Sequence, residues 1–316
     1  MALNIIPWNG RPISKPGLYQ NVDIEIYHSG KLCAGPSISS SGLRKIFFES
    51  ECHYFDQSPY NPNRAPQKEA AHFSLGRAVH HALLGEAFFT KIFVARPDRL
   101  FDPKEGKDVD WNGNRTVCRK WLAEAKEAGK TVLSGEDLTK IQGMAVSLGK
   151  EPLVRAGALN GMIEMTLAWQ DKETGVWLLS RPDVIPTDSG DFIDLKTSKS
   201  VFYPDLVRAI GDYGYHQQGA LVGEGYEILT GRKMATFSLY FVESSRPYCA
   251  RMVQLKDHDL DLGRQQNRNA LRRFVAGLNS GIWPGPGGRQ DSVQFIEISE
   301  YARKAFEQRL KFEGTD

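Results

Sequence analysis

The sequence predicts an α/β fold of the α+β type, in which helices flank a mixed central sheet and a helical N-terminal elaboration precedes the core. Three observations predict it. Helical patterns dominate the first half of the chain, short strand-like segments separated by turn residues fill the middle, and helices and strands alternate toward the end. Hydrophobic residues make up 41% of the 316 residues, which is enough to build a sizeable core.

The N-terminal third is predicted to be an irregular lead-in followed by helices. Residues 1–36 are rich in proline and glycine, and one strand is expected there, over residues 22–27. Serine is a preferred N-cap, so the serine-rich run 37–41 predicts that a helix begins there. A second helix is expected over residues 69–84, after a loop over residues 57–66.

The elements expected further along the chain follow the same reasoning. A long exposed loop is predicted over residues 97–115. Helices are predicted over residues 115–128, 136–148, 204–229, 257–279 and 299–312, and strands over residues 162–169, 176–180, 183–185, 192–196, 236–243 and 249–255. Ser134 and Asp137 have the spacing of a capping box. Residues 37–316 are expected to form a single domain, with core motifs over about 70–230 and C-terminal strands and helices over 231–316.

Composition and charge narrow the class of protein. The formal net charge is +2, so any contact with nucleic acid must come from a local basic groove rather than from overall charge. The four cysteines are far apart in the sequence, which argues against a zinc ribbon and against a disulfide framework. No apolar run approaches the ~20 residues that a membrane helix needs, and no signal peptide is recognised. A cytosolic protein that does not contact membranes is expected.

Two predicted strands that carry acidic residues are expected to form a hairpin. If residues 187–190 form a four-residue loop, Ile185 pairs with Phe192, and Asp183 lies opposite Asp194. Directly opposed side chains have Cβ atoms about 5 Å apart, so the two carboxylates repel each other unless a divalent cation bridges them. The hairpin therefore predicts a cation site, although an exposed hairpin held by salt bridges fits the spacing equally well.

Side-chain alternation along this hairpin adds a lysine to the predicted site. Asp194 and Lys196 point to the same face of their strand; Leu195 points the other way, while its backbone carbonyl could still reach a metal near Asp194. Continuing the register through the preceding turn places Glu164 opposite Asp183, an alignment that a slip of one residue would destroy. Phosphodiester hydrolysis uses such a set, because carboxylates hold Mg²⁺ or Mn²⁺ and a cationic side chain lies near the attacked phosphate.

Three predicted helices carry further polar side chains. On the first, Gly76 and His80 share a face and His80 could supply a nitrogen ligand, although a partly buried histidine bonded to a carbonyl is more common. On the second, Tyr215 and Gln218 share a face and could bind phosphate or position water, although packing against the sheet is more common. On the third, four arginines form a pattern found in DNA-binding faces and, more often, in solvated ones: Arg264, Arg268, Arg272 and Arg273.

Taken in order, these segments resemble the RecE-type exonuclease VIII proteins of phages and prophages, and more broadly the RecB-like nucleases of the PD-(D/E)XK superfamily. The matching segments are Ser-Ile-Ser-Ser-Ser-Gly-Leu from Ser37, Gly-Arg-Ala-Val-His from Gly76, Arg-Pro-Asp-Val-Ile from Arg181 with Ile-Asp-Leu-Lys-Thr from Ile193, and Tyr-His-Gln-Gln-Gly-Ala from Tyr215. Residues 230–316 match no motif of these proteins. The resemblance implies a PD-(D/E)XK, restriction-endonuclease-like core.

The resemblance also assigns roles to the matching positions. The implied metal ligands are His80, Asp183, Asp194 and the carbonyl of Leu195. The implied catalytic residues are Asp183, Asp194, Lys196 and Glu164. Among them, Lys196 is expected to orient water or to stabilise the transition state. The implied supporting or substrate-binding residues are Tyr215, Gln218, Arg77, Arg181 and Thr197. The implied cofactor is Mg²⁺, with Mn²⁺ able to substitute for it.

A substrate and partners follow from the same resemblance. The expected activity is hydrolysis of linear double-stranded DNA from a 5′ end, in phage-type homologous recombination in the cytoplasm of a bacterial host. A single-strand annealing protein is the expected partner, and some of the proteins that the chain resembles assemble as rings. Those that bind an iron–sulfur cluster use four cysteines, three of them near the C-terminus. Here Cys249 is the one cysteine after Cys118, so no cluster is expected.

Three other functions are compatible with the sequence. The same core could serve an endonuclease or a single-strand-specific nuclease, which a covalently closed circular substrate would distinguish from an exonuclease. A DNA-end-binding recombination protein with a decayed site is the second, although the complete set of Asp183, Asp194 and Lys196 argues against decay. An α/β protein with an acidic hairpin and no role in nucleic-acid binding is the third, and the near-neutral charge is compatible with it.

Overall fold

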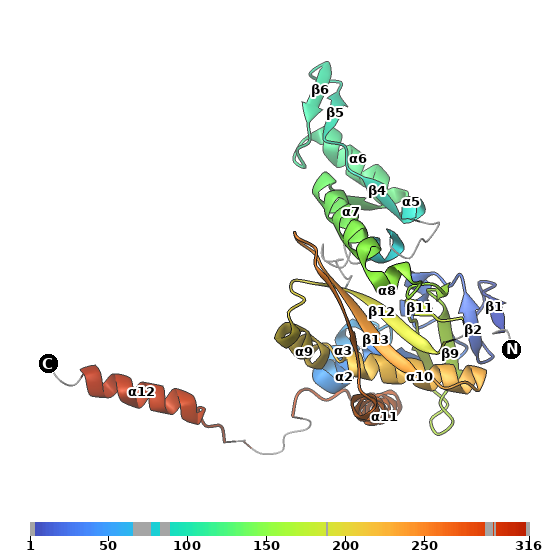
Figure 1. The fold of residues 1–316 in the computed structure, drawn as a ribbon, viewed down its shortest axis with the longest axis vertical. Coiled ribbons are helices and arrows are strands. Elements are labelled where there is room, and N and C mark those ends of the chain that lie inside the picture. The colour runs from blue at the N-terminus through green and yellow to red at the C-terminus, as the bar shows by residue number, and fades with distance from the viewer. Residues whose placement is uncertain are drawn as a thin grey trace.

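The computed structural model describes residues 4–65, 77–82, 89–187, 189–287, 293 and 295–313. Two five-stranded sheets and the helices packed on them form the body of the protein (Figure 1). The strands are β1 (Ile5–Pro7), β2 (Gly17–Gln20), β3 (Ser37–Ser39), β4 (Phe93–Ala95), β5 (Arg99–Asp102), β6 (Lys107–Asp110), β7 (Thr131–Leu133), β8 (Met162–Ile163), β9 (Thr166–Gln170), β10 (Trp177–Ser180), β11 (Val184–Ile185), β12 (Asp191–Ser198), β13 (Thr236–Glu243) and β14 (Ala250–Gln254). The helices are α1 (Ile24–His28), α2 (Ser40–Phe48), α3 (Glu51–Gln57), α5 (Phe89–Ile92), α6 (Thr116–Glu127), α7 (Gly135–Lys150), α8 (Pro152–Arg155), α9 (Tyr203–Asp212), α10 (Tyr215–Thr230), α11 (Asp257–Ser280) and α12 (Glu300–Glu313).

The two large sheets share one long hairpin that bends between them. Strand β9 pairs with β10 in the first sheet, whose order is β1-β2-β9-β10-β3. Along the same two chain segments, β8 pairs with β11 in the second sheet, whose order is β14-β13-β12-β11-β8. Glu164 and Met165 separate β8 from β9, and Glu164 has φ +54°, a left-handed conformation that regular strands do not use. Both sheets contain parallel and antiparallel pairs, so the predicted mixed sheet is confirmed, but as two sheets rather than one.

Strand β12 is covered on both faces, and its side chains alternate between two hydrophobic cores. Phe192 belongs to the core that β12 shares with α2, α10 and α11. Ile193 and Leu195 belong to the second core, to which α7 contributes. Because side chains alternate along a strand, Asp194 and Lys196 lie on the same face as Phe192, toward α10. The fold thus directs the predicted site residues of β12 toward the helix that carries Tyr215 and Gln218.

The first 36 residues are more regular than the sequence predicts. The strand expected over residues 22–27 is wrong, because Asp23 caps a helix there by accepting hydrogen bonds from two backbone N–H groups, and α1 follows. Strands β1 and β2, which the sequence pattern does not predict, join the first sheet through β9. This segment completes one edge of that sheet instead of forming an irregular lead-in. The assignment of residues 37–316 to one domain stays a prediction.

The helical stretch predicted over residues 204–229 is two helices, α9 and α10. Gly214 separates them with φ +62°, a left-handed conformation that glycine adopts without steric cost. A Cβ at this position would lie 2.4 Å from a ring carbon of Phe48, so the close approach of α2 also requires glycine. The break makes Tyr215 the first residue of α10.

The segment between α5 and α7 projects from the body (Figure 1). The loop predicted over residues 97–115 is wrong in part, because β5 and β6 pair there as an antiparallel hairpin. Their side chains are mostly polar and exposed, so the apolar alternation that marks a half-buried strand is weak. Parallel pairing of β4 with β7 closes the base of this unit.

Most of the remaining elements lie where the sequence predicts them. Helices α2, α6, α7, α11 and α12 and strands β10, β12, β13 and β14 match their predicted ranges within a few residues. The capping box is present: Ser134 accepts from the backbone N–H of Asp137, whose side chain accepts from the backbone N–H of Ser134. The helix predicted over residues 69–84 is confirmed for residues 77–82. The rest of it, with Gly76, lies outside the described residues.

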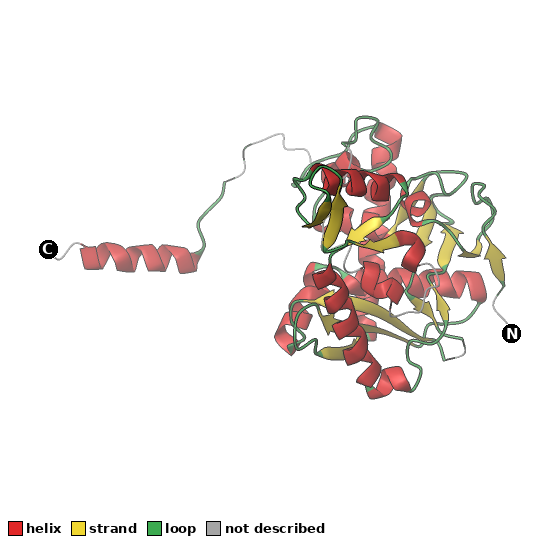
Figure 2. Cartoon of the chain, turned by 90° about the horizontal axis from the view of Figure 1, so that it is seen from above, coloured by secondary structure: helices red, strands yellow, loops and turns green. Residues whose placement is uncertain are grey.

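The C-terminal helix α12 lies away from the body (Figure 2). Phe306 and Leu310 of this helix are exposed. Within the described ranges, no helix combines the length and the apolar character that crossing a membrane requires.

Candidate active site

Strands β11 and β12 pair in the register that the turn spacing predicts. Val184 lies opposite Ile193, so Asp183 and Asp194 lie opposite each other one residue further along. The Asp183 carboxylate accepts a 2.6 Å hydrogen bond from the backbone N–H of Leu195. Both carboxylates are buried, with Asp183 7% exposed and Asp194 1% exposed. The hairpin therefore brings together two acidic groups that water hardly reaches.

The two buried carboxylates have pKa shifts of opposite sign. Burial raises the pKa of Asp194, and the negative charge of Asp183 raises it further, against the opposing effect of Lys196. Burial also acts to raise the pKa of Asp183, but the nearby His80 and Lys196 outweigh it and hold that pKa below its ordinary value. Asp194 is thus the carboxylate whose negative charge the metal-free protein disfavours.

Glu164 lies beside Asp183 on a third chain segment, as the predicted register requires, and Glu164, Asp183 and Asp194 together form an acidic row. Its backbone N–H donates to the carbonyl of Asp183 at 3.0 Å. Arg181 holds its carboxylate, with Nε donating to Oε2 at 2.6 Å, and also donates to the carbonyl of Val22 at 2.8 Å. Burial raises the pKa of Glu164, and although Arg181 opposes this effect, the pKa stays above its ordinary value.

His80 approaches the acidic row from the helical residues 77–82. Its Nδ1 lies 3.2 Å from Oδ1 of Asp183. Burial acts to lower the pKa of His80, but attraction to Asp183 outweighs it, so the pKa is raised. One ligand atom from each of His80, Glu164 and Asp183 lies within 4.8 Å of the other two, a spacing at which all three could bind one metal ion.

Lys196 lies on the same face of β12 as Asp194 and forms an ion pair with it. Its Nζ lies 5.1 Å from the centre of the Tyr215 ring. Gln218, about one turn further along α10, donates from Nε2 to Oδ1 of Asp194 at 2.9 Å. Burial acts to lower the pKa of Lys196, but Asp194 and Asp183 outweigh it and the pKa is raised, so the ammonium stays charged. The face that Tyr215 and Gln218 share points at the acidic row.

Three predicted site residues are placed differently from the others. Arg77 donates to the hydroxyl of Thr131 at 2.6 Å and lies over the ring of Phe93, which connects it to β7 and β4. Thr197 and the side chain of Leu195 point to the opposite face of β12, and Leu195 is fully buried in the second core. Their assignment to the site stays a prediction, as do the roles of all the other candidate residues.

One further cation near the site, Arg44 of α2, is not singled out by the sequence motifs. It donates from Nη1 to the carbonyl of Tyr213 at 2.7 Å. Burial lowers the pKa of Arg44, and the nearby Tyr215 and Asp194 oppose this effect. Arg44 follows Ser40 by one helical turn, but only the tertiary fold brings it close to Asp194.

Two of the four arginines along α11 form ion pairs within the protein. Arg268 forms ion pairs with Asp171 and Glu224, and Arg273 forms a bidentate pair with Glu51. These pairs tie α11 to neighbouring elements. The prediction that the arginines belong to a free solvated or DNA-binding face is therefore wrong for these two.

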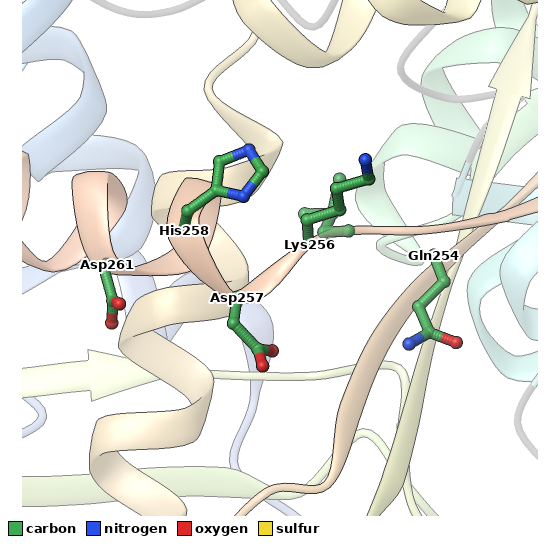
Figure 3. A pocket seen from close by; sticks show the side chains of 6 residues that line it. Gln254, Lys256, Asp257, His258 and Asp261 are labelled. Atoms are coloured by element: carbon green, nitrogen blue, oxygen red, sulfur yellow. The ribbon is translucent and has the colours of Figure 1, made fainter.

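A separate cleft lies at the start of α11 (Figure 3). It is lined by Gln254, Leu255, Lys256, Asp257, His258 and Asp261. The carboxylates of Asp257 and Asp261 point away from the ring of His258, and all three residues are exposed. This cleft holds the same residue types as the acidic row without bringing them together, so it provides a matched comparison for metal binding.

The donor set of the acidic row fits a divalent cation. One imidazole and two carboxylates lie within reach of a single ion, and oxygen-rich sets of this kind suit Mg²⁺ and Mn²⁺. The raised pKa of Asp194 and of Glu164 reflects buried negative charge that a cation would offset. The compact group contains Glu164 in place of the expected ligand Asp194, which is held by Lys196 and Gln218.

A mixed sheet that carries two opposed acids and a lysine, with a third acid and a histidine beside them, is the arrangement of a PD-(D/E)XK-type nuclease. The sequence matches the model of the PDDEXK-like domain of unknown function (DUF3799) over residues 39–295. The chain belongs to this family, and the predicted superfamily is confirmed. The match continues past residue 230, where the motif resemblance ends, and takes in β13, β14 and α11.

Two of the solved structures that are similar to the chain are exonucleases by description. A "Putative exonuclease" from Eubacterium rectale matches with a TM-score of 0.56 and 13% sequence identity, over 94% of this chain and 99% of that chain. A phage related exonuclease from Haemophilus somnus 129PT matches with a TM-score of 0.31 and 15% identity, over 65% of this chain and 94% of that chain. The first of these supports the fold. No curated protein matches the sequence.

Proposed function

We propose that this protein is a Mg²⁺-dependent DNA exonuclease that hydrolyses phosphodiester bonds of linear double-stranded DNA. The observation that carries the proposal is the burial of Asp183 and Asp194 opposite each other, with Lys196 on the same face. Burying like charges together costs free energy, so such a cluster is typical of a site where a cation and a charged substrate use it.

The finer features of the proposal rest on the resemblance to RecE-type exonucleases. They are degradation from 5′ to 3′, a role in phage-type recombination in the cytoplasm of a bacterial host, a single-strand annealing protein as partner, and assembly of copies into a ring. The acidic row supports hydrolysis itself, and it neither supports nor opposes these finer features.

His80, Asp183 and Glu164 are the residues that would hold the cation in this hydrolysis. When bound, a divalent cation offsets the charge of the phosphate and makes water more acidic. Arg181 keeps the Glu164 carboxylate in place through its 2.6 Å hydrogen bond, and the backbone N–H of Leu195 does the same for Asp183. These bonds hold the row in position before DNA binds.

Lys196 would act on the phosphate itself. Its ammonium would stabilise the negative charge that grows on the phosphate oxygens as water attacks phosphorus and the bond to the leaving nucleotide breaks. Asp194 sets the direction of the ammonium through the ion pair, and Gln218 fixes Asp194 in turn. Tyr215 covers the other side of the lysine with its ring.

The proposed activity predicts that linear duplex DNA is degraded to acid-soluble nucleotides when Mg²⁺ is present and is left intact in EDTA. A covalently closed circle of the same sequence is expected to survive, because it offers no end. Cutting of the circle would instead identify an endonuclease on the same core. Absence of release from duplex or single-stranded DNA, with Mg²⁺ or Mn²⁺, would contradict the proposal and favour a DNA-end-binding protein.

Metal binding predicts a rise in thermal stability that does not depend on catalysis. At an Mg²⁺ or Mn²⁺ concentration of about 100 times Kd, the unfolding temperature is expected to rise by about 5 °C, because the ion binds only the folded chain. Asp183→Asn and His80→Ala are expected to remove most of this rise. Differential scanning fluorimetry with and without the ion measures it.

The exposed cleft at the start of α11 supplies the matched control for this measurement. His258→Ala removes an exposed histidine that lies 3.5 Å from the carboxylate of Asp259, while the two carboxylates of the cleft, Asp257 and Asp261, point away from it. The metal-induced rise is expected to be unchanged in this variant. A rise that persists in Asp183→Asn, or that disappears in His258→Ala, would place the ion away from the acidic row.

A further inference from the structure

A group of aromatic side chains lies exposed beside the candidate active site. Phe202, Tyr203 and Tyr213, at the two ends of α9, are 72%, 60% and 61% exposed, and Phe48 of α2 is 42% exposed. We refer to these four residues as the aromatic platform. Given the nuclease function proposed above, we propose that the aromatic platform stacks on the unpaired bases of a single DNA strand next to the active site.

The exposure of these rings is not explained by the packing of α9 on the body. Leu206, which is 1% exposed, anchors the helix to the core. Tyr203 and Val207, one turn apart on the same helix, face solvent instead. Aromatic rings gain most when their area leaves water, so a group of them left open on one face is typical of a binding surface.

The aromatic platform approaches Lys196 at both ends of α9. Tyr213 contacts Tyr215 at one end, and at the other Tyr203 lies beside Arg251, two strands away from Lys196 in the sheet. The ring of Tyr215 lies 5.1 Å from Nζ of Lys196, and the ring of Tyr213 lies 5.7 Å from that of Tyr215, tilted by 35°. Phe48 reaches the same corner, since a Cβ on Gly214 would lie 2.4 Å from its ring. Successive stacked bases of one strand follow each other at a rise of about 3.4 Å, and unstacked bases lie farther apart. A strand with one phosphate at Lys196 therefore has its next bases within reach of the platform.

Positively charged side chains lie near the rings and favour a negatively charged partner. Cζ of Arg251 lies 5.6 Å from the centre of the Tyr203 ring, and Arg44 donates to the backbone just before α10. The one acidic residue in the first turn of α9, Asp205, lies 3.6 Å from Arg208. Alternating rings and cations suit a strand that alternates bases and phosphates, and every base offers a face for stacking.

The test is binding in EDTA, where no strand is cut. The full-length protein is titrated into two fluorescein-labelled strands of about 15 nucleotides, one of thymidines and one abasic with the same phosphates, and anisotropy is recorded. The double variant Phe202→Ala, Tyr203→Ala is expected to lower the affinity for the thymidine strand by about tenfold or more. Its affinity for the abasic strand is expected to stay within about twofold, because the phosphate contacts remain.

Two further variants make the outcome specific to stacking. Phe202→Leu with Tyr203→Leu keeps apolar bulk without the rings, so the same selective loss is expected, and this variant retains the surface if the alanine variant fails to fold. Phe101→Ala removes an exposed ring from β5, and unchanged affinity is expected.

Three outcomes would overturn the stacking role. They are an equal loss of affinity on both strands, no loss in either double variant, and a change in oligomeric state without a change in DNA affinity, which would make the platform an interface between protein chains. Nuclease activity enters none of these readouts. Failure of the stacking role is therefore distinguishable from failure of the proposed hydrolysis.

Discussion

Asp194→Asn is expected to lower nucleotide release from linear duplex DNA by at least about a thousandfold in the presence of Mg²⁺ or Mn²⁺. The amide has nearly the shape of the carboxylate and can still accept from Gln218, but it has no charge to offer to a cation or to Lys196. Asp191→Asn is the control, because Asp191 lies on the same strand but is exposed, and its carboxylate accepts a hydrogen bond from the hydroxyl of Thr236. Full activity is expected for the control.

The same substitution is expected to leave the metal-free protein at least as stable as the wild type at neutral pH. Burial and the charge of Asp183 raise the pKa of Asp194 above its unfolded value. Its contribution to stability is therefore fully present below the unfolded pKa and is lost as the pH rises through the folded pKa. Because an Asn side chain does not ionise, the Asp194→Asn variant does not lose this stability as the pH rises. Urea unfolding in EDTA measures the difference, and a clearly less stable variant would show that Asp194 is structural.

The acidic row could be predicted from the sequence because local turn chemistry sets it. Asp171 accepts from the backbone N–H of Thr174, and Gly175 closes the same turn with φ +70°. A turn of fixed length fixes the register of the strands that it joins. The lengths of the turns therefore align Glu164, Asp183 and Asp194 without reference to the rest of the fold.

Features that depend on distant parts of the chain could not be predicted in this way. Arg44 acquires its place near Asp194 from the packing of α2, which no local pattern encodes. The partner of Arg268 is equally remote, since Asp171 meets it only in the folded protein. An apolar stripe such as that of α9 predicts burial, yet Tyr203 is exposed, because periodicity identifies the face of a helix and not what covers it.

Lys196→Met is expected to lower the single-turnover rate by about a hundred- to a thousandfold and to change the affinity for DNA far less. Methionine keeps an apolar chain against the ring of Tyr215 but has no charge to stabilise the transition state. Lys199→Met, at an exposed position beyond the end of β12, is the matched control and is expected to retain the wild-type rate. A loss confined to affinity would mean that Lys196 binds DNA without acting on the reaction.

Lys196→Met is also expected to destabilise the metal-free protein, by about 3 kcal/mol at neutral pH, in contrast to Asp194→Asn. Asp194 and Asp183 lose the cation that offsets them, so the pKa of Asp194 rises further. Because stability linked to a raised carboxyl pKa is lost as the pH rises through it, the cost should shrink toward pH ~4, near the unfolded pKa of about 3.9. In the Asp194→Asn background the same substitution should cost less, since one buried negative charge is already gone. An equal cost in both backgrounds, at both pH values, would mean that Lys196 stabilises the fold by packing rather than by its charge.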